Sequence, residues 1–224
     1  MSGVSHAVLL CGVAADRAVW NDTEILLRDK GFTVDIPRRP RSGDLDREIE
    51  FLEPLCADAF VVGVSGGATL GLELAARGVP MRAAVLHEPA AGSLAPGLLD
   101  HVSLGFRTGG VEGFGRALYG SRWHRGLTDA DELTVAREFA MFRSFEPSQP
   151  AIDPRVLTLT VGESSPHARQ ESVRALSELL GIERRVLANT SHAAHLDNAF
   201  EAVLNDLINR ASDRQPMMGS DNDD

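Results

Sequence analysis

The sequence lacks the features that mark membrane, disulfide-rich and nucleic-acid-binding proteins. In its 224 residues no apolar run approaches the roughly 18 residues that a transmembrane helix needs. Lysine and arginine number 22 against 32 acidic residues, a net charge of −10 that disfavours nucleic-acid binding, which depends on clustered basic residues. The two cysteines, Cys11 and Cys56, are too few for a disulfide framework. We therefore expect a protein of a reducing compartment that binds neither nucleic acid nor membrane.

One apolar segment, residues 7–15, imitates a secretion signal, but no basic residue precedes it. A lipoprotein signal is also disfavoured, because Leu10 stands before Cys11 where that signal needs a small residue. We interpret the segment as a buried strand and expect a cytoplasmic protein.

Short apolar runs alternate with helical patterns along the chain, which is typical of a parallel sheet with crossover helices. The expected strands are 6–12, 32–37, 59–64, 82–88, 155–161 and 183–188, and the expected helices are 18–30, 45–56, 66–78, 168–180 and 196–210. Most of the strands lack polar alternation, as strands covered on both faces do. The pattern predicts an α/β fold with a doubly wound, mostly parallel sheet of about six strands, formed by residues 1–89 and 151–210.

Residues 90–150 interrupt this alternation. They contain five of the nine phenylalanines, together with Tyr119 and Trp123. The segment is too long for a simple crossover, and we predict a mostly helical cap inserted between two strands. Residues 211–224 are acidic, have no apolar period and are expected to be a disordered tail.

The strongest motif is Gly63-Val64-Ser65-Gly66-Gly67, a G-x-S-x-G sequence between a predicted strand and a predicted helix. In that setting the serine lies at a strained turn, crowded enough that the flanking glycines cannot carry side chains. The following amide, of Gly66, begins a helix and can stabilise negative charge. A glycine-rich turn without chemistry is the simpler alternative. A phosphate-binding loop is disfavoured, because no lysine follows the glycines. We predict that Ser65 is a nucleophile.

A serine nucleophile needs a base, and of the seven histidines we favour His192. It follows the last predicted strand and precedes the last helix, at the carboxyl edge of the sheet where Ser65 is expected. His195 is the close rival, expected near the start of that helix. A capping or surface role is the simpler alternative for either residue. A zinc pair is disfavoured, because no third ligand accompanies them.

Two glutamates are candidates for the acid that orients the base. Glu88 ends the strand 82–88, and Glu163 directly follows the strand 155–161, so chain order does not separate them. Glu88 lies at the end of the strand next to the Ser65 strand, whereas Glu163 begins a flexible loop. Asp197 is a poorer candidate that suits the first turn of the last helix.

These segments together resemble the α/β-hydrolase superfamily, in particular a bacterial subgroup. VLLCG resembles the family's oxyanion strand and loop, DIPRRPRSGD its segment after the next strand, GVSGGATLGLELAARG its nucleophile turn and helix, and SHAAHLDNAFEAVLNDL its histidine loop and final helix. The resemblance covers nearly the whole chain except residues 90–150 and the tail. VLHEP and TVGESSP resemble the group that includes zearalenone-lactone hydrolase, which implies Glu88 as the acid and Glu163 as the second choice.

Three features depart from the family pattern. Val64 replaces the common histidine before the nucleophile, and Cys11-Gly12-Val13 replaces the usual His-Gly. The second oxyanion amide beside that of Gly66 is therefore either Gly12 or Val13. The family's first β-hairpin is also missing, which implies a trimmed version of the fold.

The resemblance implies a hydrolase without cofactor or metal that cleaves an ester, lactone or related acyl bond. The aromatic insertion 90–150 would cover the site and favour a small to medium apolar substrate. Ser65 would attack, His192 would transfer the proton and Glu88 would orient His192. The alternatives are a non-hydrolytic or carbon–carbon-bond-cleaving enzyme on the same scaffold, or a slow ligand-binding member. Arg38, Arg39 and Arg41 could bind an anion, but a solvated loop is the simpler expectation.

Overall fold

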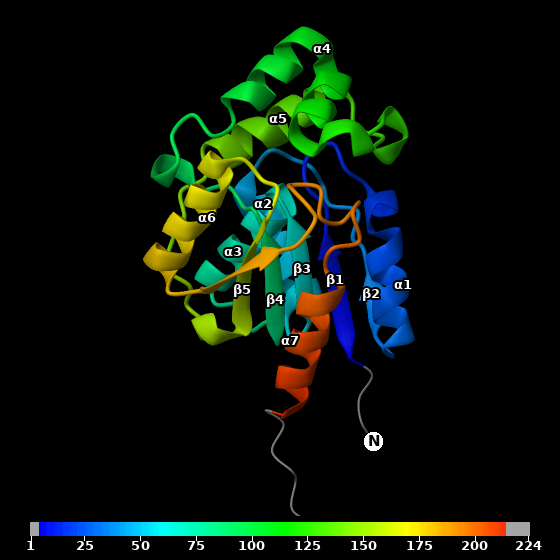
Figure 1. Ribbon diagram of the computed structural model, residues 1–224, viewed down its shortest axis with the longest axis vertical. Helices are drawn as coiled ribbons and strands as arrows, with labels where there is room; N and C mark the ends of the chain where they lie inside the picture. Colours follow the sequence, from blue (N-terminus) through cyan, green and yellow to red (C-terminus); the bar gives the residue numbers. More distant parts are fainter. Residues whose placement is uncertain (1–4, 214–224) are drawn as a thin grey trace, which may run out of the picture.

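The apolar runs of the sequence form the strands of a single sheet in the computed structural model, which describes residues 5–213 (Figure 1). The strands are β1 (His6–Leu10), β2 (Thr33–Asp35), β3 (Phe60–Val64), β4 (Ala83–His87), β5 (Leu157–Gly162) and β6 (Glu183–Leu187). Their order is β2-β1-β3-β4-β5-β6, and all neighbours are parallel. The predicted doubly wound parallel sheet of six strands is confirmed.

The sheet register brings the ends of its central strands to one level. Leu10 pairs with Gly63, and Val64 pairs with His87. Strands β3, β4 and β5 are buried along their whole length, whereas the edge strands β2 and β6 are partly exposed. Loops after β1, β3 and β4 therefore leave the sheet beside one another, at its carboxyl edge.

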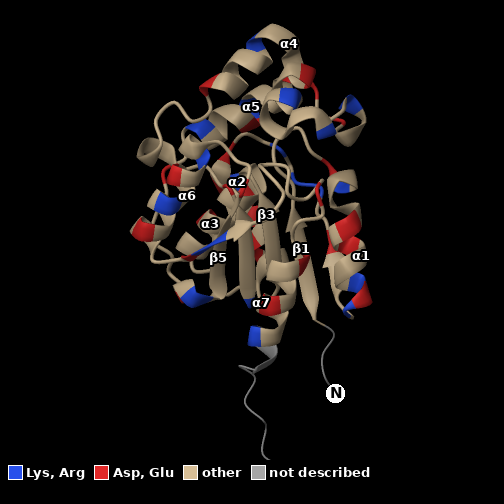
Figure 2. Ribbon diagram, in the orientation of Figure 1, with Lys and Arg blue, Asp and Glu red and all other residues tan. Residues whose placement is uncertain are grey.

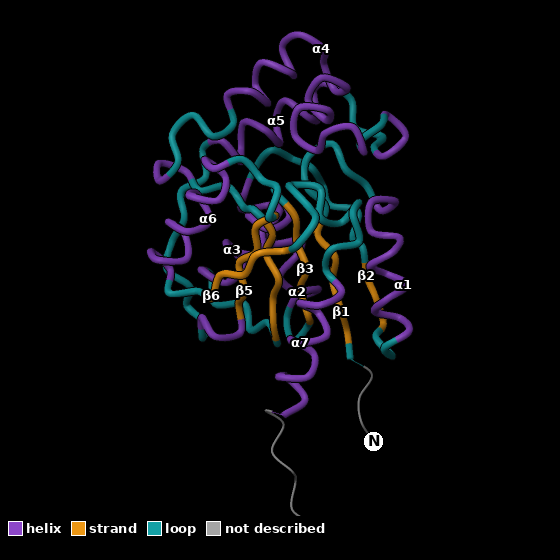
Figure 3. The backbone as a smooth tube through the Cα atoms, in the orientation of Figure 1, coloured by secondary structure: helices purple, strands orange, loops and turns teal. Residues whose placement is uncertain are grey.

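Helices cover both faces of the sheet (Figures 1 and 3). They are α1 (Asn21–Asp29), α2 (Leu45–Cys56), α3 (Gly66–Ala76), α6 (His167–Leu180) and α7 (Glu201–Asp213). Helix α3 packs against β1, β3 and β4, while α7 lies on the opposite face against β4. Helix α2 begins where the Asp44 carboxylate accepts hydrogen bonds from the amides of Asp46 and Arg47.

The last helix differs from its prediction. Residues 192–200 form successive turns, although the helix was expected from residue 196, and Asn198 lies in the left-handed region at φ 52°. His195 therefore lies in these turns and not at the start of α7, which begins at Glu201. Residues 211–213 belong to the end of α7, so this part of the predicted tail is helical, and residues 214–224 lie outside the described residues.

Residues 90–150 form two long helices above the carboxyl edge of the sheet (Figure 1). Helix α4 (Asp100–Tyr119) bends at Gly109 and Gly110, where the backbone leaves helical geometry, and α5 (Glu132–Arg143) packs against it. Short 3-10 segments connect them: η2 (Gly92–Leu94) before α4, and η3 (Gly120–Arg122) and η4 (Arg125–Leu127) after it. Phe114 packs edge-on against Phe106 and Phe139, so the aromatic residues give this cap its own apolar interior.

The cap is bonded to the loop that follows β1. Trp123 donates its indole N–H to the Ala14 carbonyl over 2.8 Å, and Tyr119 donates its hydroxyl to the Val13 carbonyl over 2.9 Å. Gly115 lets Trp123 approach, because a Cβ there would lie 2.1 Å from the indole ring. The cap is therefore attached directly to the predicted oxyanion loop.

The expectation of a solvated arginine loop is wrong for two of its three residues. Arg38 is exposed, but the Arg39 side chain is only 2% exposed. It donates to Glu48 of α2 over 2.7 Å and to Glu138 of α5 over 2.6 Å. Arg41 is also buried and pairs with Asp16. Arg39 therefore links α2, beside the sheet, to the cap. This link could not be predicted from the sequence, because Glu138 lies in the inserted segment.

Acidic and basic side chains alternate over the outer helices and the cap, while the strands carry few charges (Figure 2). None of the helices formed by residues 5–213 has the length and hydrophobicity to span a membrane.

Candidate active site

Ser65 lies at the turn between β3 and α3, in the left-handed region at φ 56°. This conformation is strained for a residue with a side chain. The flanking glycines are required by crowding. A Cβ on Gly63 would lie 2.6 Å from the backbone of Gly67, and a Cβ on Gly67 would lie 2.0 Å from the carbonyl oxygen of Leu10. The turn therefore has the tight strand–serine–helix geometry that the motif predicts.

The loop after β1 lies directly beside Ser65. A Cβ on Gly12 would lie 3.2 Å from the Ser65 Cβ and 3.1 Å from the Val64 carbonyl oxygen. Within residues 5–213, the amides of Gly12, Val13 and Gly66 donate no hydrogen bond to the protein. These are the three amides that the sequence proposes as oxyanion donors.

Glu88 follows β4 immediately and is fully buried in the left-handed region, at φ 47°. Its Oε1 accepts hydrogen bonds from the Gly162 amide over 2.9 Å and from the Ser165 hydroxyl. Its Oε2 accepts from Nδ1 of His192 over 2.8 Å and lies 3.3 Å from Nε of Arg169. Donors on both oxygens hold this carboxylate in one orientation.

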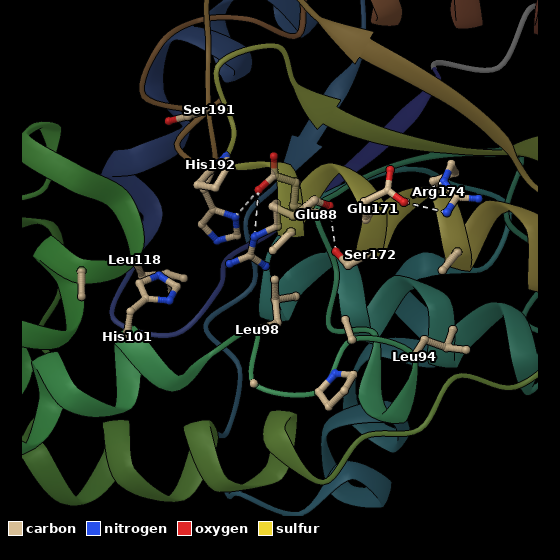
Figure 4. A pocket seen from close by; sticks show the side chains of 18 of the residues that line it. Glu88, Leu94, Leu98, His101, Leu118, Glu171, Ser172, Arg174, Ser191 and His192 are labelled. Carbon is tan, nitrogen blue, oxygen red and sulfur yellow. Dashed lines mark hydrogen bonds and ion pairs between the residues drawn. The ribbon is translucent and has the colours of Figure 1, made fainter.

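His192 approaches Glu88 from the loop after β6 and is 7% exposed (Figure 4). Because a carboxylate only accepts, Nδ1 carries the proton in this contact. In the neutral ring, Nε2 then has a free lone pair. Nε2 is buried and has no hydrogen-bond partner among the described residues. The ring is therefore oriented to accept a proton at Nε2.

Burial and charge set the ionisation of this pair. Burial lowers the pKa of His192 to about 4, helped by the Arg169 charge, although Glu88 opposes the shift. Burial alone would raise the pKa of Glu88, but His87, His192 and Arg169 outweigh it and hold this pKa well below its usual range. At neutral pH the pair is thus an ionised carboxylate and a neutral imidazole.

A second histidine supports the loop that carries His192. His87, buried at the end of β4, donates from Nε2 to the Ser191 carbonyl over 3.0 Å. Its Nδ1 then accepts from the Thr160 hydroxyl over 3.0 Å. This pairing fixes the backbone immediately before His192.

The alternative residues lie elsewhere. Glu163 is exposed, and its Oε2 accepts from the amide of Asn189 over 3.1 Å. His195 is buried against Trp20, with ring centroids 5.2 Å apart, and its Nδ1 has no partner among the described residues. Asp197 accepts from the hydroxyl of Thr190 over 2.7 Å. The structure thus brings Glu88 to His192 and gives the alternatives other surroundings.

Two residues at the site were not predicted. Tyr119, the only tyrosine of the chain, stacks on His192 with ring centroids 5.5 Å apart. Burial raises the pKa of Tyr119, and a hydrogen bond with the Ser65 side chain lowers it in part. Arg169, in the first turn of α6, is buried beside Glu88. The aromatic insertion was a signal for Tyr119, but nothing in the sequence singles out Arg169.

No group of three or more histidine, cysteine, aspartate or glutamate side chains could hold a metal ion in residues 5–213.

Solved structures similar to this chain have the same fold. A carboxylesterase of Nitrososphaera gargenis is 16% identical with a TM-score of 0.68, and the alignment covers 95% of this chain and 93% of the other. An enol-lactonase of Burkholderia xenovorans is 18% identical with a TM-score of 0.65, covering 93% and 92%. MenH of S. aureus is 13% identical with a TM-score of 0.70, covering 95% and 96%.

No curated protein sequence matches the chain. The sequence model of the alpha/beta hydrolase family, in contrast, matches residues 7–206, which include the serine turn, both long cap helices and the histidine loop. That match extends over most of the sequence and agrees with the sheet topology and the strained serine turn. The chain therefore belongs to the alpha/beta hydrolase family.

Proposed function

We propose that the protein is a serine hydrolase that cleaves an ester or lactone through an acyl-enzyme, with Ser65, His192 and Glu88 as its catalytic residues. One observation carries the proposal: a buried, ionised Glu88 accepts a 2.8 Å hydrogen bond from His192 at the sheet edge where the strained turn presents Ser65. A serine hydroxyl becomes a competent nucleophile only when a base takes its proton and another group orients that base.

In the first step the Ser65 Oγ attacks the substrate carbonyl carbon, and its proton passes to Nε2 of His192. Glu88 stabilises the resulting imidazolium and keeps Nδ1 protonated. The tetrahedral intermediate collapses, His192 returns the proton to the leaving oxygen, and the acyl group stays on Ser65. Water attacks the acyl-enzyme by the same sequence and releases the acid.

The oxyanion would be stabilised by the Gly66 amide together with that of Gly12 or Val13. The Gly66 amide belongs to the first turn of α3, where the helix dipole also favours negative charge. A single donor of this kind contributes about 3–4 kcal/mol to transition-state stabilisation in other serine hydrolases.

Tyr119 lies between the nucleophile and its base. Its ring stacks on His192 while its hydroxyl reaches Val13 and the Ser65 side chain. Ser65 is not hydrogen-bonded to His192, so a side-chain rotation must precede proton transfer. Catalytic hydrogen bonds often form only when substrate binds.

The substrate class follows from the cap. Phe114, Phe139 and Phe142 line the narrow space around Ser65, and a mostly apolar cavity of about 790 Å³ adjoins Glu88 and His192. This volume suits a small to medium apolar molecule.

Intact-mass analysis after treatment with a fluorophosphonate tests the proposal. The wild type should gain one adduct and hydrolyse 4-nitrophenyl butyrate, whereas Ser65→Ala should do neither. Ser164→Ala, which changes an exposed serine near the same edge, is the matched control and should behave as wild type. A folded wild type that takes no adduct would contradict the proposal, and so would equal labelling of Ser65→Ala.

A further inference from the structure

The cavity of about 790 Å³ lies between the loop after β4, helix α4 and the start of α6 (Figure 4). Leu94, Leu98 and Leu118 form part of its wall. In Figure 4, the bonded pair of Glu88 and His192 lies between His101 and Leu118 on one side and Glu171, bonded to Arg174, on the other. The cavity therefore combines an apolar wall with two separate groups of polar side chains.

A much smaller space, about 20 Å³, adjoins Ser65 and Gly66. Three residues line both spaces: Glu88, Leu118 and Arg169. The larger cavity and the nucleophile are thus separated by the side chains of these residues, and Arg169 is the only cation among them. The guanidinium of Arg169 therefore lies at the boundary between the cavity and the space at Ser65.

Arg169 is buried but incompletely paired. Its side chain is 7% exposed, and its Nε lies 3.3 Å from Oε2 of Glu88. Its two Nη groups have no hydrogen-bond or ion-pair partner among residues 5–213. A buried guanidinium is costly unless its donors are satisfied, and a carboxylate matches the forked donors of arginine.

Arg174, the second arginine of the cavity wall, is fully paired, unlike Arg169. Arg174 lies on the same helix but is 47% exposed and bonds both Glu171 and Glu178. Glu171 is thereby occupied, and Glu88 is held by its own donors. Burial also lowers the pKa of His101 and of His192, the two histidines of the wall, so both are neutral at pH 7. Arg169 is left as the cation of this wall with free donors.

We propose that the Nη groups of Arg169 bind a carboxylate of the substrate, so that the enzyme acts on carboxylate-bearing esters or lactones whose apolar part fills the cavity. The inference rests on the proposed function, because it places the scissile bond at Ser65. It adds a charge requirement that an apolar pocket alone would not impose.

Two pairs of substrates test this proposal. The first pair is 4-carboxyphenyl butyrate and its neutral analogue 4-carbamoylphenyl butyrate. The second is mono-4-nitrophenyl adipate and 4-nitrophenyl hexanoate, which place the carboxylate on the acyl side instead. The wild type should show a kcat/KM at least tenfold higher for the carboxylate member of one pair. Arg169→Gln should abolish that ratio, and Arg169→Lys should leave part of it.

The ratio within one variant is informative because any effect of Arg169 on Glu88 acts on both members of a pair. Arg174→Gln, on the same helix and the same wall, is the control and should keep the wild-type ratio. A wild-type ratio near one in both pairs would overturn the proposal, as would a ratio unchanged in Arg169→Gln. Equal loss on both members would assign Arg169 to positioning Glu88 alone and would also overturn it.

A binding measurement separates this proposal from the proposed function. Calorimetry with the non-hydrolysable amides 4-butyramidobenzoate and 4-butyramidobenzamide uses Ser65→Ala with and without Arg169→Gln. Selective binding of the benzoate, at least tenfold tighter and lost with Arg169→Gln, would support the carboxylate site even if no ester were hydrolysed. Ester hydrolysis without carboxylate preference in rate or binding would leave the hydrolase intact and refute the site.

Discussion

The ends of β4 and β5 carry one glutamate each, at the same edge of the sheet, in opposite environments. Glu88 is fully buried and contacts five polar groups, whereas Glu163 is exposed and its carboxylate accepts one backbone hydrogen bond. Chain order and strand position are alike for the two. Position at a strand end is therefore not enough for a carboxylate to orient a histidine. The carboxylate must also be buried and held by several hydrogen-bond donors.

The largest expected effect is the loss of activity when Glu88, but not Glu163, is changed to glutamine. Glu88→Gln should lower kcat/KM for 4-nitrophenyl butyrate by about a thousandfold or more, because an amide cannot stabilise the imidazolium. Glu163→Gln should stay within threefold of wild type, since its side chain only supports the Asn189 amide. Steady-state kinetics on both variants decide the matter. Activity lost in Glu163→Gln but retained in Glu88→Gln would exchange the two roles.

A second prediction concerns the pH dependence of stability that results from His192, the partner of Glu88. Burial lowers the pKa of His192 to about 4, below the 6.5 of the unfolded chain. Between these values the unfolded state binds a proton that the folded state does not, so the free energy of unfolding falls as the pH decreases from 6.5 to 4. At pH 5 this amounts to about 2 kcal/mol for His192.

Urea denaturation at pH 7.5 and pH 5 measures this difference. His192→Gln should reduce the stability lost between the two pH values by that amount, while Glu163→Gln should leave the loss as in wild type. If His192→Gln lost as much stability on acidification as wild type, the buried neutral histidine would be refuted.

A smaller effect is expected from the donors of Glu88. Ser165→Ala removes the hydroxyl that bonds Oε1 and should lower kcat by about tenfold, with a stability cost of about 1–2 kcal/mol. Its exposed neighbour offers the control, because Ser164→Ala leaves the backbone hydrogen bond to Thr190 intact. Equal behaviour of the two variants in kinetics and denaturation would show that Glu88 needs no such donor.

The smallest expected effect is the change in stability when the exposed Glu163, after β5, is replaced. Glu163→Ala should change the free energy of unfolding by less than about 1 kcal/mol, since water can replace a solvent-accessible acceptor. Thermal denaturation at pH 7.5 provides the measurement. A cost above 2 kcal/mol would mean that the end of β5 is as dependent on its carboxylate as the end of β4.

Local patterns are enough to predict the sheet and the serine turn, and they name Glu88 and His192 as candidates while leaving Glu163 and His195 open as alternatives. Uninterrupted apolar strands and crowded glycines depend on neighbours close in the sequence or on the regular spacing of strands. Contacts between distant segments are not predictable in this way. In the sequence Arg39 resembles a surface charge, because its partner Glu138 lies in a distant helix, α5. The role of Arg169 is likewise visible only from its contact with Glu88 in the structure. The start of α7 was misplaced because the turns before it contain good helix formers.

The buried bonds of Arg39 also constrain how this protein can change. One guanidinium joins α2, the cap and the carbonyl of Cys11 in the loop beside Ser65. Arg39, Glu48 and Glu138 form a buried triad, so loss of Arg39 would leave both carboxylates without their cation, whereas replacing all three by apolar residues of similar volume can be neutral. The three positions should therefore accept mutations only in concert, and a cap exchanged from a relative must bring a residue compatible with Arg39 and Glu48. Changes in the cap that alter the substrate range must therefore remain compatible with Arg39, which lies outside the cap.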